Sequence, residues 1–297
     1  MLINQVSKTT GLTKKAIEYY TLEGLISPLV LENGYRDFSE NDIEVLNKIS
    51  VLRKLDISAD EIKAILSDRS NNALQVISVR KELNFQREVA KKAILGKLSS
   101  GESYAKISEE LQVIDKSKTI TEKLLEAFPG YYGRLICLHF ARFLNEPVNT
   151  ESQQAAYERI ITFLDNIPPL NLPEDLQEYL AEGTKHMGTE QITAMIENTK
   201  SSIENPDDFL AKNKETLEQY LAFKQSEDYR QSPAYKSMEL IKEYNSTSGY
   251  YDVFIPALKQ LSSSYSEYYR QMEVANEKLL AQYPELEKMS NQASQLG

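Results

Sequence analysis

A single short segment, LENGYRDF at residues 31–38, constrains the fold most strongly, because the sequence on either side of it is typical of helices. Asn33-Gly34 predicts a type I′ hairpin turn, since both central residues of that turn need positive φ angles. The residues that flank the turn suit two very short strands. We therefore expect one small hairpin, with Tyr35 and Arg36 at its tip, in an otherwise helical chain.

Two short helices precede this hairpin. Residues 4–10 form an amphipathic stretch that Gly11 would end, and Thr13 can cap a second helix that Gly24 would end. Two short helices joined by a glycine-containing turn are typical of a helix-turn-helix, in which the second helix can enter the major groove of DNA. The pattern predicts such a motif immediately before the hairpin.

Two further helices follow the hairpin. Ser39 opens one of them, with Asp42 at its N3 position, and Ser58 with Glu61 forms a capping box that opens the other. The order helix, turn, helix, hairpin, helix and helix within residues 1–69 predicts a winged helix-turn-helix domain. The hairpin would be its wing.

These segments together resemble the DNA-binding domain of the MerR family of transcriptional regulators. The resemblance is collinear over residues 2–68. It rests on the tandem tyrosines Tyr19-Tyr20, the Gly-Leu-Ile-x-Pro motif that starts at Gly24 and the Asn-Gly-Tyr-Arg motif of the hairpin. It implies a dimeric regulator that binds a palindromic promoter operator. It also implies that the bound dimer distorts the promoter DNA, so that RNA polymerase is affected only indirectly.

Two positions depart from the family pattern. Glu18 stands before the tandem tyrosines, where the family usually has an arginine, and Thr21 follows them, where the family usually has an aspartate. A carboxylate such as that of Glu18 faces a phosphate poorly. We therefore expect either weak DNA binding or a larger contribution from Lys14 and Lys15.

The residues expected to contact DNA lie on the second helix and at the hairpin tip. A helix N-terminus presents N–H donors and the positive end of the helix dipole to phosphates and base edges. The expected set is Thr13, Lys14, Lys15, Tyr20, Tyr35 and Arg36. In the alternative interpretation both tandem tyrosines pack in the core and Arg36 is only a solvated turn cation. We accept that alternative for Tyr19 but not for Arg36.

A long helix is expected after the DNA-binding domain. No proline or glycine interrupts the chain from Ser67 to Leu95, and seam residues recur there at alternating three- and four-residue steps, which is typical of a coiled coil. They are Val76, Val79, Leu83, Gln86, Ala90 and Ala93. In proteins of the MerR family a helix at this position pairs antiparallel with its twin, so the resemblance implies a homodimer held by residues 70–98. The alternative is a core helix of a monomer.

The rest of the chain is expected to be helical. Residues that open or break helices recur through it; they are Pro129-Gly130, Thr150, Pro168-Pro169, Pro173, Gly183, Asn205-Pro206 and Ser232-Pro233. No alternating β pattern is present in this half. We therefore expect an all-α fold with one small β-hairpin. Its domains would be a winged helix-turn-helix at 1–69, a coiled-coil helix at 70–98 and a helical effector domain at 101–297.

Charge argues at first sight against a nucleic-acid partner. The formal net charge of the chain is −10, and residues 1–70 contribute nine cations against eleven acids, or −2. DNA binding must therefore depend on where particular cations lie. Hydrophobic residues at 41% and charged residues at 26% are typical of a soluble globular protein. No signal peptide and no membrane-spanning apolar run is visible, so we expect a cytoplasmic protein without a membrane partner.

The sequence offers no metal or cofactor site. Its one cysteine, Cys137, excludes a multi-thiolate cage, and His139 would point about 200° away from it on a helix. The other histidine, His186, is alone. We expect no cofactor. We also expect no enzymatic activity, because no nucleophile with its base and no phosphate loop is recognisable.

An organic ligand is the remaining class of effector. The chain has 18 tyrosines and 9 phenylalanines, and aromatic residues follow one face of its last third at helical spacing. An aromatic lining with a few hydroxyl groups is typical of a small-molecule site. The candidate ligand contacts are Tyr132, Phe140, Tyr251, Phe254, Tyr265 and Tyr268. The alternative is that this stripe is simply the core of the helices.

The sequence therefore predicts a ligand-responsive regulator of the MerR type. Regulators that resemble it often recognise lipophilic drugs, which implies an organic, lipophilic or cationic effector and a role in multidrug sensing. In the alternative, the protein is a DNA-binding regulator whose helical half binds another protein or only supports the dimer.

Overall fold

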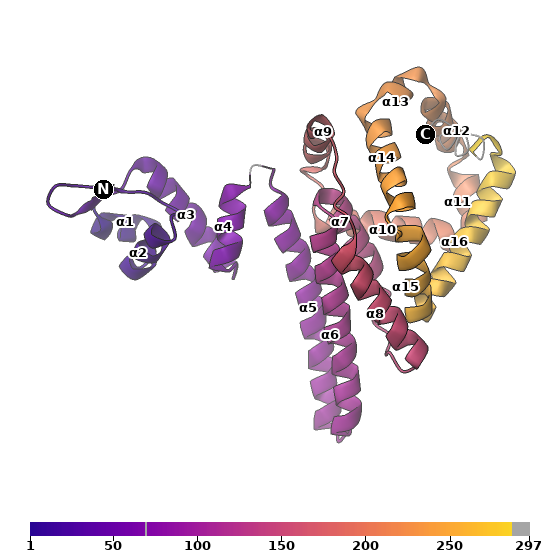
Figure 1. The fold of residues 1–297 in the computed structure, drawn as a ribbon, viewed down its shortest axis with the longest axis horizontal. Helices are drawn as coiled ribbons and strands as arrows, with labels where there is room; N and C mark the ends of the chain where they lie inside the picture. Colours follow the sequence, from indigo (N-terminus) through magenta and orange to yellow (C-terminus); the bar gives the residue numbers. More distant parts are fainter. Residues whose placement is uncertain (69, 287–297) are drawn as a thin grey trace. The chain divides into compact units, whose positions relative to one another are not determined.

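The computed structural model describes residues 1–68 and 70–286. The chain divides into two compact units, which we call the N-terminal unit (residues 1–77) and the C-terminal unit (residues 78–297). Almost all secondary structure is helical, and the described residues contain one two-stranded hairpin (Figure 1). The expected all-α fold with a small β element is confirmed. In the described part of the chain, no helix has the length and apolar character needed to cross a bilayer.

The N-terminal unit has the element order of a winged helix-turn-helix. Its elements are α1 (Ile3–Thr10), α2 (Lys14–Leu22), β1 (Leu29–Val30), β2 (Arg36–Asp37), α3 (Glu40–Lys54), α4 (Ala59–Ser67) and the start of α5 (Asn72–Ser99). Local sequence sets the helix ends as expected. Gly11 ends α1 in the left-handed conformation, with φ of 70°, and the Thr13 hydroxyl accepts a hydrogen bond from Ala16 N at 3.1 Å at the start of α2. Capping boxes open α3 and α4.

The wing is a minimal antiparallel ladder. Leu29 pairs with Asp37, and Val30 pairs with Arg36. The amino group of Met1 donates to Asp37 Oδ1 at 2.6 Å, so the start of the chain lies beside the second strand. This third segment holds the second strand in place, which a two-residue ladder does poorly alone.

The turn of the wing differs from the expected type I′. Gly34 has a positive φ of 81°, but Asn33 does not have a positive φ. Gly34 N donates to Leu31 O at 2.8 Å, and Leu31 N donates to Tyr35 O at 2.8 Å. This is the pattern of a type I turn followed by a left-handed glycine. The sequence located the hairpin correctly, but the expected turn type was wrong.

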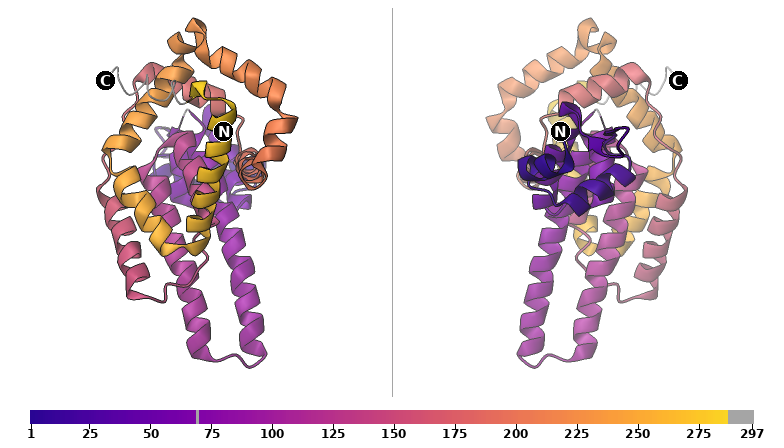
Figure 2. Two further views of the ribbon diagram at one scale, coloured as in Figure 1. Left: turned by 90° about the vertical axis from the view of Figure 1, so that its right-hand side faces the viewer. Right: turned by 90° about the vertical axis from the view of Figure 1, so that its left-hand side faces the viewer.

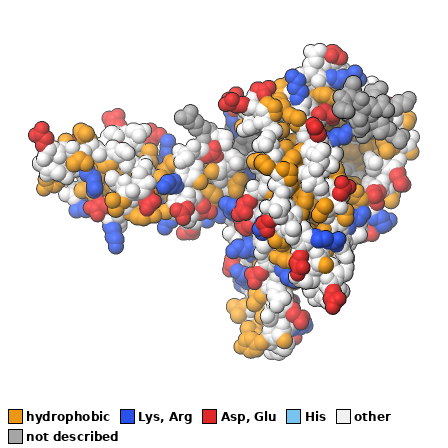
Figure 3. Space-filling view, in the orientation of Figure 1, with side chains coloured by type: hydrophobic (Ala, Val, Ile, Leu, Met, Phe, Trp, Pro, Cys, Tyr) orange, Lys and Arg blue, Asp and Glu red, His pale blue; other side chains and the backbone are white. Residues whose placement is uncertain are grey.

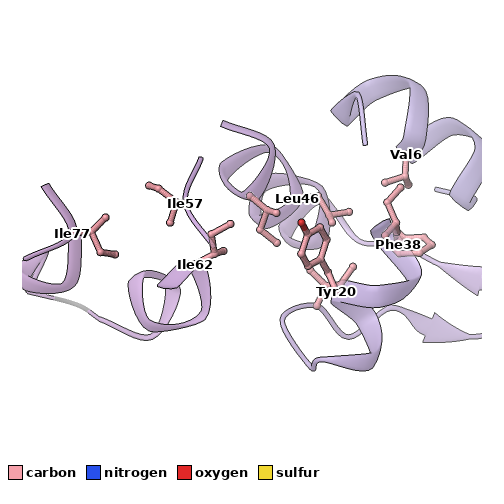
Figure 4. Close-up of a cluster of buried hydrophobic side chains, with 10 residues drawn as sticks. Val6, Tyr20, Phe38, Leu46, Ile57, Ile62 and Ile77 are labelled. Carbon is pink, nitrogen blue, oxygen red and sulfur yellow. The ribbon is translucent and has the colours of Figure 1, made fainter. Parts of the chain in front are cut away.

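One hydrophobic cluster holds the N-terminal unit together (Figure 4). Every element except the two short strands contributes to it. Its buried members are Val6, Ile17, Tyr20, Ile26, Phe38, Leu46, Ile49, Ile57, Ile62 and Ile77. The cluster fixes the orientation of α2 and ties the loop after β2, through Phe38, to the helices.

The C-terminal unit begins with a long antiparallel helix pair. α5 runs to Ser99, and α6 (Tyr104–Ala127) returns beside it after a turn that contains Gly101, whose φ is 95° (Figure 2). Ion pairs join the two helices: Arg80 Nε lies 2.7 Å from Glu122 Oε2, and Lys97 Nζ lies 2.8 Å from Glu110 Oε1. The single chain therefore supplies an antiparallel neighbour for α5.

This helix pair buries some of the residues that were expected to form the dimer seam. Val79 and Leu83 are buried within the single chain, at 0% and 5% exposure. Val76 and Ala90 are half-buried, whereas Gln86 and Ala93 are exposed. The six seam residues thus do not share one free face. Dimerisation through them stays a prediction.

Ten α-helices and a π-helix complete the described part of the C-terminal unit. They are α7 (Gly130–Ala141), α8 (Glu151–Asn166), α9 (Glu174–Thr184), α10 (Thr189–Glu204), α11 (Pro206–Lys212), α12 (Lys214–Gln225), α13 (Glu227–Gln231), α14 (Pro233–Thr247), η1 (Tyr250–Phe254), α15 (Ile255–Leu261) and α16 (Ser263–Gln282). The expected breaks separate these helices except at Gly183, which lies in the last turn of α9. Gly133 is required in α7, because a Cβ atom there would lie 1.8 Å from Phe128 O.

The π-helix has a local cause. Pro256 has no N–H, and its ring would clash with a carbonyl four residues earlier in a regular α-helix. The backbone widens just before it, where Ile255 N donates to Tyr250 O, five residues earlier. Gly249 precedes the π-helix with φ of 87°, and a Cβ atom at this glycine would contact the Phe163 ring at 3.5 Å. The widened turn places Phe254 in the core at 0% exposure.

Candidate nucleic-acid interface

The first turn of α2 presents a cationic surface. Thr13, Lys14 and Lys15 are all exposed, and no acidic side chain lies in that turn. The Thr13 hydroxyl caps Ala16 N, so it orders the helix start as well as facing solvent. Glu18 is exposed one turn later. The N-terminus of α2 thus combines free N–H donors with two lysine ammonium groups, which suits contact with phosphates.

The burial of the two tandem tyrosines is the reverse of what the sequence predicted. Tyr20 is 5% exposed and packs in the hydrophobic cluster of the N-terminal unit, whereas Tyr19 is 43% exposed. The expected burial of Tyr19 is therefore wrong. Adjacent helical residues point about 100° apart, so only one of the pair can face the core, and the docking of α2 selects Tyr20. A phosphate contact from Tyr20 stays a prediction, and Tyr19 is the more accessible hydroxyl.

The wing places Tyr35 and Arg36 at the surface. Tyr35 is 63% exposed at the end of the turn, and Arg36 is half-buried on β2. No carboxylate of the described residues forms an ion pair with Arg36. An unpaired guanidinium beside an exposed aromatic ring suits the backbone or the narrow minor groove of DNA. These two contacts stay predictions.

The candidate ligand contacts gather in an aromatic core of the C-terminal unit. The Phe140 ring lies 5.1 Å from the Phe254 ring and 5.6 Å from the Tyr265 ring. Phe140, Phe254, Tyr265 and Tyr268 are buried, whereas Tyr251 is 50% exposed. These rings fill the space between helices in edge-to-face contacts. Their contact with a ligand stays a prediction.

Tyr132, the remaining candidate, joins α7 to α14. Its hydroxyl lies 3.1 Å from Asn245 Oδ1. Burial raises the pKa of Tyr132 to about 12, so the phenol stays protonated near neutral pH. Its hydroxyl already has a partner within the chain, as buried tyrosines require.

An open groove of about 790 Å³ lies on the C-terminal unit between α8 and the π-helix. Its apolar lining includes Phe163, Ile167 and Val253, and polar groups include Arg159 and Ser248. Its size falls within the range of small-molecule sites. None of the six candidate ligand contacts lines this groove.

The one cysteine is unsuited to metal binding. Cys137 is 0% exposed, and its thiol donates to Thr121 O at 3.5 Å. Burial raises the pKa of Cys137 to about 12, whereas metal ligation requires the thiolate. No cluster of three His, Cys, Asp or Glu side chains that would hold a metal exists among the described residues.

His139 is a half-buried group that titrates. It packs against Phe143 and Tyr268 with ring centroids 5.7 Å and 5.5 Å away. Burial, aided by the charge of Arg142, lowers the pKa of His139 to about 4. In the unfolded chain His139 is therefore protonated below about pH 6.5, whereas in the folded chain it is protonated only below about pH 4.

This difference predicts acid sensitivity. The free energy of unfolding should fall as the pH drops from about 6.5 to 4, by up to about 3 kcal/mol from this group. Urea unfolding at pH 7 and pH 4.5 measures the loss. His139→Gln should reduce it, whereas His186→Gln, a change at an exposed histidine, should not. Equal acid sensitivity in all three proteins would contradict the assignment.

A buried polar link across α5, α6 and α7 was not expected from the sequence. Arg87 is 9% exposed, and its Nη2 donates to Thr121 Oγ1 at 2.5 Å. The backbone carbonyl of Thr121 accepts from Cys137, as above. The only sequence signal is an arginine four residues after Leu83, on the same helical face as the buried seam residues.

Comparisons with known proteins agree with the geometry of the N-terminal unit. The family model described as "MerR HTH family regulatory protein" matches residues 1–69. The "Heavy metal-dependent transcription regulator 2" of Rhizobium meliloti is 38% identical over 96 residues, which are 30% of this chain and 65% of that protein. The chain thus spans less than two thirds of that relative. No solved structure gives a significant match.

Two further relatives are covered over most of their length. The transcriptional regulator CueR of Vibrio cholerae is 35% identical over 134 residues, which are 45% of this chain and 84% of that protein. The regulator YfmP of Bacillus subtilis is 29% identical over 136 residues, which are 46% of this chain and 87% of that protein. The match to the family model and the similarity to nearly the whole of CueR show that the chain belongs to the MerR family of helix-turn-helix regulatory proteins.

Proposed function

We propose that the protein is a dimeric, ligand-responsive transcriptional regulator that binds a palindromic promoter operator. The observation that carries this proposal is the exposed surface formed by the α2 N-terminus and the wing. Lys14 and Lys15 face solvent at the helix dipole, and Arg36 has no ion-pair partner among the described residues. All three relatives are transcription regulators by name. The cationic surface compensates locally for the acidic composition of the chain.

The dimer needs a free face on α5, and the structure offers one opposite the buried residues. Phe85 and Val89 are 66% and 54% exposed, and Ala93 is exposed one turn further on. Residues four apart follow one helical face, and Phe85 lies about 200° from Leu83 on the helix. We therefore propose Phe85, Val89 and Ala93 as the contact with a second copy of the chain.

The far end of the helix pair adds apolar surface. Leu95 is 64% exposed, and Tyr104, at the start of α6, is 79% exposed. Hydrophobic side chains gather at this tip in the space-filling view (Figure 3). Several large apolar side chains exposed along one helix pair are typical of an interface. Burial of a side chain such as Phe85 stabilises by roughly 1.5–3 kcal/mol, so an antiparallel pair of these faces would support a stable dimer.

The proposed effector is an organic molecule. Two of the relatives differ in what their names state: the Rhizobium protein is called heavy metal-dependent, whereas YfmP carries no such term. In this chain the only thiol is buried and protonated, which argues against a similar dependence. The groove beside the π-helix and the aromatic core support a lipophilic ligand in the C-terminal unit.

The metal question has a direct test. Cys137→Ser should leave the DNA affinity and its response to metal salts unchanged, because a thiol with a pKa of about 12 supplies no thiolate. The measurement is operator binding by fluorescence anisotropy with copper(I), zinc or mercury(II) at micromolar concentration. A metal response in the native protein that Cys137→Ser abolishes would establish metal sensing and refute an organic effector.

A second function fits the same fold. The C-terminal unit would bind a protein, or would only support the dimer, if no small molecule binds it. A thermal-melting screen of the full chain against lipophilic organic compounds separates these functions, because ligands that bind the native state raise the melting temperature. We expect at least one compound that shifts melting and also changes the operator footprint. A compound-independent footprint would favour the second function.

A further inference from the structure

Arg134 is the most deeply buried charged side chain in the described chain. It lies on α7 at 1% exposure. Its Nη1 donates to Met187 O at 2.7 Å, and its guanidinium carbon lies 5.7 Å from the centroid of the Tyr131 ring. Its Nε is buried and has no hydrogen-bond partner. A neutral carbonyl and an aromatic face are thus its only partners among the described residues.

A guanidinium in this position lacks the anion that buried cations normally have. It does not deprotonate in proteins, so burial cannot be relieved by loss of the charge. Burial lowers the pKa of Arg134, and no carboxylate acts on it. Arg142, the C-cap of α7, differs in having a carboxylate partner, because its Nη1 lies 3.2 Å from Glu197 Oε1, although its Nε and Nη2 are also buried without a hydrogen-bond partner.

The N–H groups of Arg134 that have no partner lie side by side on one edge of the guanidinium, which we call the fork. Nη1 is occupied by Met187 O, whereas no described residue accepts from Nε or Nη2. Nε and Nη2 lie on the same edge of the guanidinium, the edge that binds both oxygens of a carboxylate in parallel. The side chain is therefore arranged for a planar oxyanion that residues 1–68 and 70–286 do not supply.

A helix N-terminus adjoins the same turn. Gly188 follows Met187 and is the N-cap of α10, a 16-residue helix, but it has no side chain to cap the first N–H groups. Helix α7 packs against both α9 and α10 (Figure 1). The free N–H donors and the positive dipole end of α10 favour an anion next to Arg134. Lys185 and His186 are exposed on this turn.

We propose that Arg134 and the N-terminus of α10 form a binding site for a small oxyanion, with the carboxylate of an organic acid as the group that fits the fork. The site lies within the C-terminal unit and does not depend on whether the chain binds DNA. It is separate from the groove beside the π-helix, whose lining residues include none of those named here.

Thermal melting of the full-length protein tests the proposal. Sodium formate and sodium phosphate are compared with sodium chloride at equal ionic strength and pH 7.5. Formate should raise the melting temperature by roughly 3 °C or more near saturation. Arg134→Lys keeps the charge but lacks the fork, so it should lose this shift. Arg142→Met, at the C-cap of the same helix, should retain it, because Glu197 already pairs with the Arg142 charge. Phosphate alone giving a shift would support an oxyanion site but overturn the preference for carboxylate.

A second variant pair covers the case in which Arg134→Lys fails to fold. Gly188 has an ordinary φ of −75°, and a Cβ there would meet only the flexible end of Gln191, at 3.1 Å. Gly188→Asp places a carboxylate beside Arg134, so it should melt higher than the equally good cap Gly188→Asn and should no longer respond to formate. A full formate response in Gly188→Asp overturns the site. So does a formate shift equal to that of chloride in the native protein.

Discussion

Replacing both Phe85 and Val89 with glutamate is expected to convert the protein from a dimer to a monomer. Both side chains are more than half exposed in the single chain, so the fold should tolerate the change. In an antiparallel dimer the four new carboxylates would face an apolar seam without partners, at a cost of more than about 3 kcal/mol. The dimer dissociation constant should rise by more than about 100-fold, and palindrome binding should be lost with it.

Light scattering at micromolar concentration, together with the thermal melt, measures this effect. Leu111→Glu on α6 is the matched control, because it puts the same charge on an exposed apolar position of the neighbouring helix. Leu83→Glu should behave differently from both, since Leu83 is buried within the chain and its loss should unfold α5 and α6 together. A dimer that survives the Phe85 and Val89 changes would place the interface elsewhere.

Arg36→Ala is expected to weaken operator binding by at least about 100-fold. A charge-assisted hydrogen bond contributes about 1.5–3 kcal/mol, and a dimer loses one at each wing. The loss should be similar for operator and unrelated DNA, because a backbone contact carries no base information. The slope of log affinity against log salt should flatten by about 0.9 for each lost phosphate contact.

Lys48→Ala is the control for net charge. Lys48 pairs with Glu44 on α3, so its loss removes one cation without altering the wing or α2. Fluorescence anisotropy between 50 and 200 mM salt compares the two variants. An Arg36→Ala protein with the native affinity and slope would show that the wing does not contact DNA.

Local sequence predicted most of the N-terminal unit, because its helix ends depend on short-range interactions. Glycine in the left-handed conformation and Ser or Thr caps act within one turn, as at Gly11 and Thr13. The turn type of the wing was harder to predict. Asn33-Gly34 suits two turn geometries, and the third chain segment at Met1 helps to position the second strand.

Long-range packing determines which side chains are buried, and the sequence alone did not predict this. The two tandem tyrosines are the same residue type and have nearly the same sequence neighbours. Only the docking of α2 buries Tyr20 in the hydrophobic cluster and leaves Tyr19 exposed to solvent. A repeating seam such as that of α5 does not reveal whether the chain's own helix or a second copy covers it. α6 takes that place beside α5, so the free face is the one with Phe85.

The candidate ligand site shows the same limit. An aromatic stripe at helical spacing is compatible with a core or with a cavity, and rings such as Phe254 and Tyr265 are packed in the core. One residue of that region, Arg134, indicates a different kind of site. Arg134 stands in the largely apolar run YYGRLICLHFARFL, which also holds His139 and Arg142, and a charged residue needs a reason to be buried there.

Selection of DNA from a random library by the full-length protein tests the central claim most directly. If two copies each present an α2 N-terminus and a wing, the enriched sequences should contain two inverted half-sites at a fixed spacing. A footprint on such a sequence should protect both half-sites symmetrically, and the Phe85 and Val89 double variant should enrich no palindrome. Recovery of the starting library without enrichment, or of a single unpaired half-site, would contradict the account of a dimeric DNA-binding regulator.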